Sequence, residues 1–300
     1  MRWKWNPVYK MEKMTSSRSG KMSIIVFGMN LILTVTALIM LYTIMHETGY
    51  TGEIPYQSFI QLYQMIAYFE FTLILLIVPA LTSGAVSGER ERQTLDLLLS
   101  TKMNCWDIIV GKLAASFRTV LIVILSGFPI LSLVFIYGGV SEFDLVFLFA
   151  YYVITALFSG SLGIMLSALF KKTSTSTAVS YIVLLLLTVG TGAATYLFYR
   201  ISFTKFVEIS NPSFYPTAGK SIYFLLVNPA ISFYCFMNGQ TGNGREFHEL
   251  LYRMGVYEKN IVLENWVTLS IGIQFALSVI FICVAVRAID PMKKKYSILS

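Results

Sequence analysis

Charged residues are scarce in this 300-residue chain. They make up 13% of the sequence, whereas hydrophobic residues make up 56% and the mean hydropathy is +0.67. Soluble domains typically carry about 25% charged residues, so this chain is too apolar to cover its own surface in water. The composition therefore predicts an integral membrane protein rather than one or two soluble domains.

Cysteine and histidine are also rare. The three cysteines, Cys105, Cys235 and Cys283, are odd in number and widely spaced, which argues against a disulfide framework. Only two histidines are present, and the sequence contains no His-Glu-x-x-His or Gly-x-Ser-x-Gly motif. The Gly-Lys step at 111–112 lacks the upstream glycine and the following hydroxyl of an ATP-binding P-loop. The sequence thus predicts no catalytic, metal or cofactor site in this chain.

Six apolar runs are long enough to cross about 30 Å of hydrocarbon as helices. They cover residues 23–45, 58–82, 113–137, 144–170, 178–199 and 266–287. The expected fold is therefore all-α, with a six-span domain over 23–287, a basic segment 1–22 before it and a basic tail 288–300 after it. In the first segment Asn6 and Pro7 favour a helix start, and its Lys and Trp residues suit a helix lying on the membrane surface.

Lys and Arg residues are distributed unevenly among the connections. The segments 1–22, 83–112, 171–172 and 287–300 carry six, four, two and four of them, whereas the short connections after the first and third spans carry none. Because positive residues stay on the cytoplasmic side, we expect both termini and the 83–112 connection in the cytoplasm. The net charge of +7 then reflects membrane topology and lipid contact rather than nucleic-acid binding. The expected location is a bacterial plasma membrane.

The connection from 201 to 265 is long and contains another apolar run at 221–237. As a seventh span this run would be short, and it would move the basic tail to the outside. The Asn228-Pro229 step in its middle interrupts a helix, because proline lacks an N–H and clashes with the preceding turn. We therefore predict a re-entrant or interfacial segment that breaks at Asn228 and Pro229 within an extracellular loop.

The stretch SGERERQTLDLLLST, residues 87–101, directly follows the second span. Read as one helix, it places Ser87 at the N-cap. One face would carry an ion-pair ladder of Glu89, Arg92 and Asp96. The opposite face would carry Leu95, Leu98 and Leu99. Such a helix suits a groove on a partner protein, and it equally suits packing against its own bundle.

The run from Gly88 to Thr101, followed by IIVGKL at 108–113, resembles the connection between spans two and three of type-2 ABC exporter permeases. The Asn-Pro-Val sequence at 6–8, the six spans and the Asn-Pro element between spans five and six are also similar to that family. The sequence departs from the family's usual pattern at two positions. Gln93 stands where glycine is common, and Lys102 stands where proline is common.

The resemblance implies that residues 87–101 form a cytoplasmic coupling helix in a cleft of a separate ATPase subunit. The residues expected to make this contact are Glu89, Arg90, Glu91, Arg92, Thr94, Leu95, Asp96, Leu98 and Leu99. It also implies two ATPase copies, which bind ATP and Mg²⁺, and a second permease chain, identical or related. The chain would then be the membrane-spanning subunit of an exporter for an amphiphilic substrate such as a lipid, peptide or drug. Two alternatives stay open: an ion-gradient carrier, and a non-transporting membrane module for assembly or sensing.

One acid, Glu70, lies near the middle of the second span. A carboxylate at that depth costs roughly 2.5–3.5 kcal/mol or more unless it is protonated, paired or hydrated. Glu70 is therefore a candidate for the substrate path, together with Gln64. The alternative is a protonated glutamic acid held inside the bundle.

Small residues recur on the fourth span at four-residue spacing, at Ser159, Gly163 and Ser167. This spacing lets the backbones of two membrane helices approach closely. The close contact could lie at a dimer interface or within the chain.

Overall fold

The computed structural model describes residues 7–18, 20–51, 56–100, 103–136, 141–209, 216–242, 249, 251–252, 254–255 and 261–290. All regular structure in these residues is helical, which confirms the all-α prediction. Trp3, Trp5 and Asn6 lie outside the described residues, as do Lys102 and the basic tail beyond 290. The described residues form two compact units, one up to Tyr181 and from Leu277 onward, the other Ile182–Ala276.

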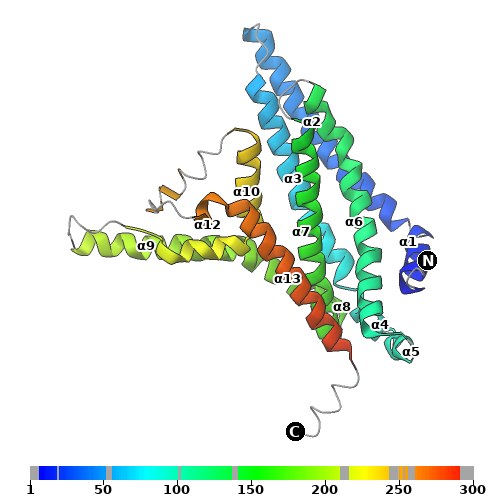
Figure 1. The fold of residues 1–300 in the computed structure, drawn as a ribbon. Helices are drawn as coiled ribbons and strands as arrows, with labels where there is room; N and C mark the ends of the chain where they lie inside the picture. Colours follow the sequence, from blue (N-terminus) through cyan, green and yellow to red (C-terminus); the bar gives the residue numbers. More distant parts are fainter. Residues whose placement is uncertain are drawn as a thin grey trace. The chain divides into compact units, whose positions relative to one another are not determined.

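The first unit is a helical bundle. Its helices are α1 (Pro7–Arg18), α2 (Lys21–Thr51), α3 (Tyr56–Thr82), α4 (Ser87–Glu91), α5 (Leu95–Leu99), α6 (Cys105–Ile136), α7 (Glu142–Leu169), the first part of α8 (Thr173–Leu185) and the last part of α13 (Trp266–Ile289). α3 packs on both α6 and α7, α2 packs on α3 and α6, and α1 lies against α6 (Figure 1). α3 and α6 therefore lie together at the centre of this bundle.

Six helical segments among the described residues are long and apolar enough to cross a membrane. The count becomes seven if one bent helix pair in the second unit is taken as a single span. The prediction of six membrane-spanning helices is therefore confirmed by length and composition.

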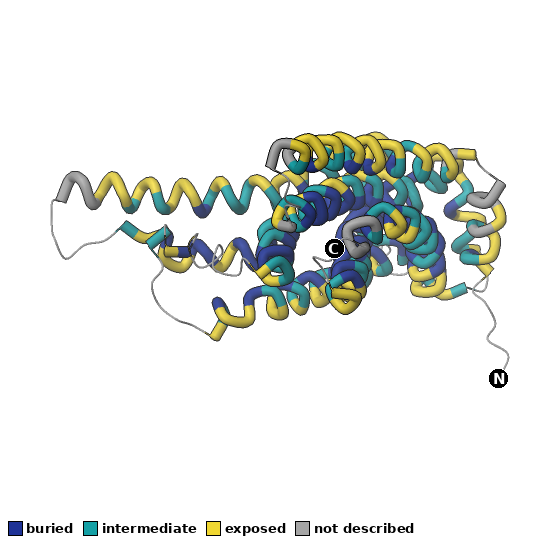
Figure 2. Tube along the Cα trace, turned by 90° about the horizontal axis from the view of Figure 1, so that it is seen from above, coloured by how far each residue is buried: buried dark blue, intermediate teal, exposed yellow. Residues whose placement is uncertain are grey.

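Burial differs strongly between the helices. Most of the apolar stretch of α7 is buried, whereas most of that of α2 is exposed. Figure 2 shows the buried positions on the sides of the helices that face their neighbours. The exposed side of α2 carries large apolar side chains such as Phe27, Leu38 and Tyr42, which suits contact with lipid tails.

α7 begins at a capping box. The Ser141 hydroxyl accepts a hydrogen bond from the Phe143 N–H at 3.4 Å, and the Asp144 carboxylate accepts one from the Ser141 N–H at 3.0 Å. Both bonds satisfy N–H groups that would have no partner within the helix. This cap fixes the point at which the chain re-enters the bundle after α6.

The small residues of α7 are used inside the bundle. Ser159 and Ser167 are fully buried, and Ser167 accepts hydrogen bonds from the N–H groups of Val86 and Ser87, each at 2.9 Å. A Cβ atom at Gly163 would overlap the hydroxyl of Thr82 at the end of α3. At Gly163 and Ser167 the close packing predicted from the sequence is therefore a contact between α7 and the α3–α4 segment of the same chain.

The second unit is built from shorter elements. They are the end of α8, the π-helical turn η1 (Leu186–Gly190), α9 (Thr191–Ile209), the 3₁₀-helix η2 (Gly219–Val227), α10 (Pro229–Gln240), α12 (Ile261–Glu264) and the start of α13. α9 continues past the end expected for the fifth span at 199 and reaches Ile209.

The chain bends by 89° between η2 and α10, at Asn228. The Asn228 side-chain oxygen caps α10 by accepting from two N–H groups of its first turn, at 2.8 and 3.1 Å, and Pro229 takes the first helical position. The Asn228 amide nitrogen donates to the Thr188 carbonyl at 2.6 Å and to the Thr191 hydroxyl at 2.9 Å. The bend is thus held by both ends of one amide, and it lies at the predicted Asn-Pro step.

Replacing Gly163 by Ala should destabilise the bundle by about 1–3 kcal/mol, because the added methyl group overpacks the contact with Thr82. The measurement is thermal unfolding of the purified chain in detergent. The matched control is Gly28→Ala on α2, where an added Cβ meets nothing within 4 Å. Equal unfolding temperatures for the two variants would contradict the close packing of α7 on α3.

Candidate functional site

The segment after α3 does not form one helix, so the expectation of a continuous helix over 87–101 is wrong. It forms α4 and α5, separated by Arg92–Thr94. Gln93 adopts a left-handed conformation with φ of 59°, the Gln93 N–H donates to the Arg90 carbonyl, and the Thr94 N–H donates to the Glu89 carbonyl. These are the two bonds of a Schellman motif, which ends a helix. Gln93 thus occupies the position that glycine usually takes in this motif.

Ser87 is not the helix cap that the sequence suggested. The backbone hydrogen bonds continue from the end of α3 into α4, with Gly88 N–H donating to the Gly84 carbonyl at 3.0 Å. Because the helical hydrogen bonds continue from α3 into α4 almost without a break, α4 needs no N-cap of its own. The Ser87 hydroxyl instead donates to the Ser83 carbonyl at 3.0 Å and lies 3.1 Å from the Ser167 hydroxyl.

The predicted ion-pair ladder is replaced by pairing with a buried lysine. Lys112 on α6 is 1% exposed, and its Nζ lies 2.6 Å from Glu12 Oε1 on α1 and 3.2 Å from Glu89 Oε1 on α4. The Thr94 hydroxyl also donates to the Glu89 carboxylate. Glu89 therefore pairs with Lys112 rather than forming a ladder with Arg92 and Asp96, and one lysine ties α1, α4 and α6 together.

Arg90 and Glu91 hold the connection between α7 and α8 from its two sides. The Arg90 guanidinium donates to the carbonyls of Phe170 and Ala168, at 3.1 and 3.0 Å. The last carbonyls of a helix have no partner within the helix, so this contact caps α7. The Glu91 carboxylate accepts from the N–H and the hydroxyl of Thr173, each at 2.8 Å. It caps α8 at the end that favours negative charge.

The leucines of α5 are divided between the buried and the exposed side differently from what the sequence predicted. Leu95 is 6% exposed and belongs to a buried apolar cluster, and Leu98 and Leu99 pack partly against that cluster. The other buried members of the cluster are Val86, Ile108, Ile109, Leu113, Ile164, Ala168, Ala285 and Ile289. Leu97, by contrast, is 69% exposed. The predicted leucine face therefore packs inward, and α5 presents a different leucine outward.

An outward surface remains on this segment. We call it the α4–α5 surface and define it as Arg92, Gln93, Asp96 and Leu97, all of which are exposed. Beside it lies a groove of about 560 Å³. The groove is lined by Arg90, Gln93, Leu95, Asp96, Leu99, Ala288 and Ile289. The surface combines one charge of each sign, an amide and an apolar side chain on an anchored backbone.

The remaining candidates lie elsewhere. Glu70 is fully buried within the bundle, and Gln64 is half-buried on the same helix. Asn228 and Pro229 belong to the second unit. Within the part of the chain that the structure describes, no cluster of His, Cys, Asp and Glu could hold a metal ion.

Sequence reasoning missed the partners that anchor the segment: Glu12, Lys112, Ser167 and Thr173. Along the chain, each is separated by 23 to 100 residues from the group that it binds. Helical spacing therefore carries no information about these partners. One signal was available. Lys112 is a lysine at the very start of an apolar span, where a charge needs a partner.

A comparison with protein-family models decides the family. The model described as "ABC-2 family transporter protein" matches residues 7–289, which is nearly the whole chain. This chain belongs to the ABC-2 transporter family. No curated protein sequence matches it. As an ABC-2 family member, the chain is a multi-pass membrane permease of an ABC transporter, and the family implies an ABC ATPase as its partner. The resemblance seen in the sequence is thereby confirmed.

Replacing Lys112 by Met keeps an unbranched side chain, one atom shorter, and removes its charge. Glu12 and Glu89, whose side chains are 27% and 23% exposed, then lose their shared partner, and residual hydration limits the loss to about 1–3 kcal/mol. We expect a lower unfolding temperature in detergent. Lys10→Met, at an exposed position on α1, is the control and should unfold like the wild type. A wild-type unfolding temperature for Lys112→Met would refute the anchoring role of this lysine.

Replacing Gln93 by Gly should stabilise this ABC-2 permease. A left-handed conformation costs a residue with a Cβ roughly 1–2 kcal/mol, and glycine adopts it freely, although glycine also gains entropy in the unfolded chain. We expect a net gain of up to about 1 kcal/mol in thermal unfolding. Ser100→Gly, at a right-handed position with φ of −73°, should give no gain. Destabilisation by Gln93→Gly would mean that the left-handed turn is not the native conformation.

Proposed function

We propose that this chain is the permease subunit of an ATP-driven exporter, and that the α4–α5 surface is where its ATPase subunit docks. The observation that carries the proposal is the contrast between the two sides of one short segment. The inward side is bonded to α1, α6, α7 and α8, whereas Arg92, Asp96 and Leu97 point away from the bundle and are exposed. A rigid segment with an exposed outer surface suits a docking role.

The anchoring contacts assign different roles to the charged residues. Glu89, Arg90 and Glu91 position the segment on the bundle, with Thr94 bonded to Glu89. The α4–α5 surface makes the contact with the ATPase. This division revises the expectation that the two glutamates and the inward leucines meet the partner directly.

The same bonds supply a path for mechanical coupling. A displacement of α4 would act on α6 through Lys112, on the end of α7 through Arg90 and on the start of α8 through Glu91. Because packed helices move as rigid bodies rather than deform continuously, ATP-driven closure of the ATPase pair would tilt these helices together. ATP and Mg²⁺ are bound by the ATPase subunits in this proposal.

The charge distribution supports the orientation. The α4–α5 surface, both termini and the Lys171-Lys172 pair lie on the cytoplasmic side, since Lys and Arg concentrate in these segments. The bent η2–α10 pair is then a re-entrant element on the outer side, broken at Asn228 and Pro229. Two such permeases, identical or related, assemble with two ATPase subunits in a bacterial plasma membrane. The cargo is amphiphilic, and its path passes Gln64 and Glu70.

Leu97→Ser tests the docking surface without touching the anchor. The side chain is 69% exposed, so the fold should be unaffected. If it is buried against the ATPase, its loss should cost about 1 kcal/mol or more, which weakens association at least about fivefold. The measurement is binding of the purified ATPase subunit to the permease in nanodiscs.

Leu97→Met is the matched control, because it retains the apolar volume and should bind normally. ATPase binding that is unchanged in Leu97→Ser, with the permease folded, would show that the ATPase docks elsewhere.

A further inference from the structure

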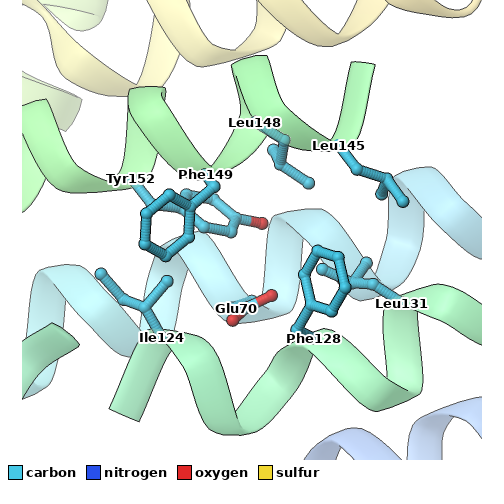
Figure 3. Close-up of a pocket in the computed structure, with 8 residues that line it drawn as sticks. All are labelled: Glu70, Ile124, Phe128, Leu131, Leu145, Leu148, Phe149 and Tyr152. Carbon is cyan, nitrogen blue, oxygen red and sulfur yellow. The ribbon is translucent and has the colours of Figure 1, made fainter. Parts of the chain in front are cut away.

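Glu70 sits at the junction of three helices in the interior of the bundle. It belongs to α3, is 0% exposed, and points into a small cavity between α3, α6 and α7 (Figure 3). The other residues that line this cavity are Ile124, Phe128, Leu131, Leu145, Leu148, Phe149 and Tyr152. All but Tyr152 are apolar, so the carboxyl group faces an almost entirely apolar wall.

Within the part of the chain that the structure describes, the Glu70 carboxyl group has no hydrogen-bond partner. Neither Oε1 nor Oε2 of Glu70 is bonded to any group in the described residues. The hydroxyl of Tyr152, the polar neighbour in the cavity, donates instead to the Ala67 carbonyl at 2.9 Å. Glu70 therefore differs from Glu89, Arg90 and Glu91 at the α4–α5 end, whose charged groups are paired or bonded.

The packing around the carboxyl group is made possible by a glycine. A Cβ atom at Gly127 on α6 would overlap the Glu70 carboxyl group. The carboxyl group thus lies directly on the α6 backbone, in the space that a side chain at position 127 would fill. This close contact leaves no room for a hydration shell on that side.

The cavity has a volume of about 10 Å³, which holds at most one water molecule. One water cannot replace the hydration of an ionised carboxylate, whose burial without a partner is strongly unfavourable. A neutral carboxylic acid needs far less. The closed bundle therefore accommodates Glu70 with a bound proton and excludes its ionised form.

The titratable groups around Glu70 do not supply a compensating charge. They are Tyr63 on α3, Tyr152 on α7 and, next to Tyr63, Asp144 near the start of α7. All three are acids, and α6 contributes only Ile124, Gly127, Phe128 and Leu131 to this region. Among the described residues, no cationic side chain lines the cavity. A bound proton is therefore the positive charge that this cavity can accommodate.

We infer that Glu70 is a proton-binding site whose occupancy controls the separation of α6 from α3 and α7. With the proton bound, the three helices close around the neutral acid and one water. Release of the proton leaves a carboxylate that must be hydrated, and hydration on the α6 side requires α6 to move away at Gly127. This inference goes beyond docking of the ATPase and holds whether or not that proposal is correct.

α6 contains a feature suited to such a movement. Pro129 lies inside the helix, two residues after Gly127. Proline removes one hydrogen bond of the helical ladder, and helices bend most readily at such positions. The missing bond is the one to the Leu125 carbonyl, so α6 can bend over 125–129, a stretch that includes Gly127, without disturbing Lys112 and the α4–α5 end.

The experiment is infrared spectroscopy of the purified full-length chain in nanodiscs, titrated from mildly acidic to alkaline pH. We expect a carbonyl band of a protonated carboxyl group that is present in the wild type, lost in Glu70→Gln, and shifted in Glu70→Asp. The band should disappear as the pH rises. Glu142→Gln, which removes an exposed carboxyl group at the start of α7, is the matched control and should leave the band in place.

The movement of α6 away from α3 and α7 is measured by hydrogen exchange of the α6 amides around Gly127. The exchange rates are corrected for their intrinsic dependence on pH. The wild type should exchange faster at the pH where the band is lost, and Glu70→Gln should stay slow throughout. If a variant does not fold, the pH titration of the wild type alone, through its carboxyl band and its α6 exchange, tests the inference. An absent or pH-independent band, or α6 exchange that does not follow it, would overturn the inference.

Discussion

A charged group inside an apolar bundle needs an opposite charge or a set of hydrogen bonds, because its desolvation otherwise costs several kcal/mol. Lys112 meets this requirement by drawing Glu12 from α1 and Glu89 from α4 onto α6. Once Glu89 is fixed, the neighbouring Arg90 and Glu91 are placed at the α7–α8 connection, where they bond to two carbonyls and to Thr173. The buried ammonium group thus ties α4 to α1 and α6, and the bonds of Arg90 and Glu91 tie it to α7 and α8.

The same constraint separates the two sites in the bundle. At the α4–α5 end, Glu89, Arg90 and Glu91 are paired or bonded, and these contacts hold short helices that would not be stable alone. In the bundle interior, Glu70 has no partner, and only a proton can make it neutral. The first arrangement is rigid and suits the transmission of force from an ATPase. The arrangement around Glu70 is sensitive to its surroundings, and it suits a group that gains or loses a proton when the helices close or separate.

Much of the fold could be predicted from local sequence. Apolar runs predicted the membrane-spanning helices, and Asn228-Pro229 predicted the break between η2 and α10, because both signals act within a few residues. The prediction of one continuous helix over 87–101 failed for two reasons. Gln93 takes a left-handed conformation that its side chain disfavours, and the partner of Glu89 lies on another helix. Helical spacing placed Glu89 and Leu95 on opposite faces of one helix, and the family resemblance implied that both contact the ATPase. The bundle instead draws both inward and leaves Leu97 exposed.

The central claim is that the α4–α5 surface of this ABC-2 permease contacts an ABC ATPase. The most direct test places a photo-crosslinking amino acid at position 97, and separately at position 95, in the native membrane, and identifies the cross-linked partner by mass spectrometry. Position 97 should yield a subunit with an ATP-binding P-loop, and buried position 95 should yield only cross-links within the permease. Cross-links from position 97 to lipid or to the permease itself, with no ATPase, would contradict the account.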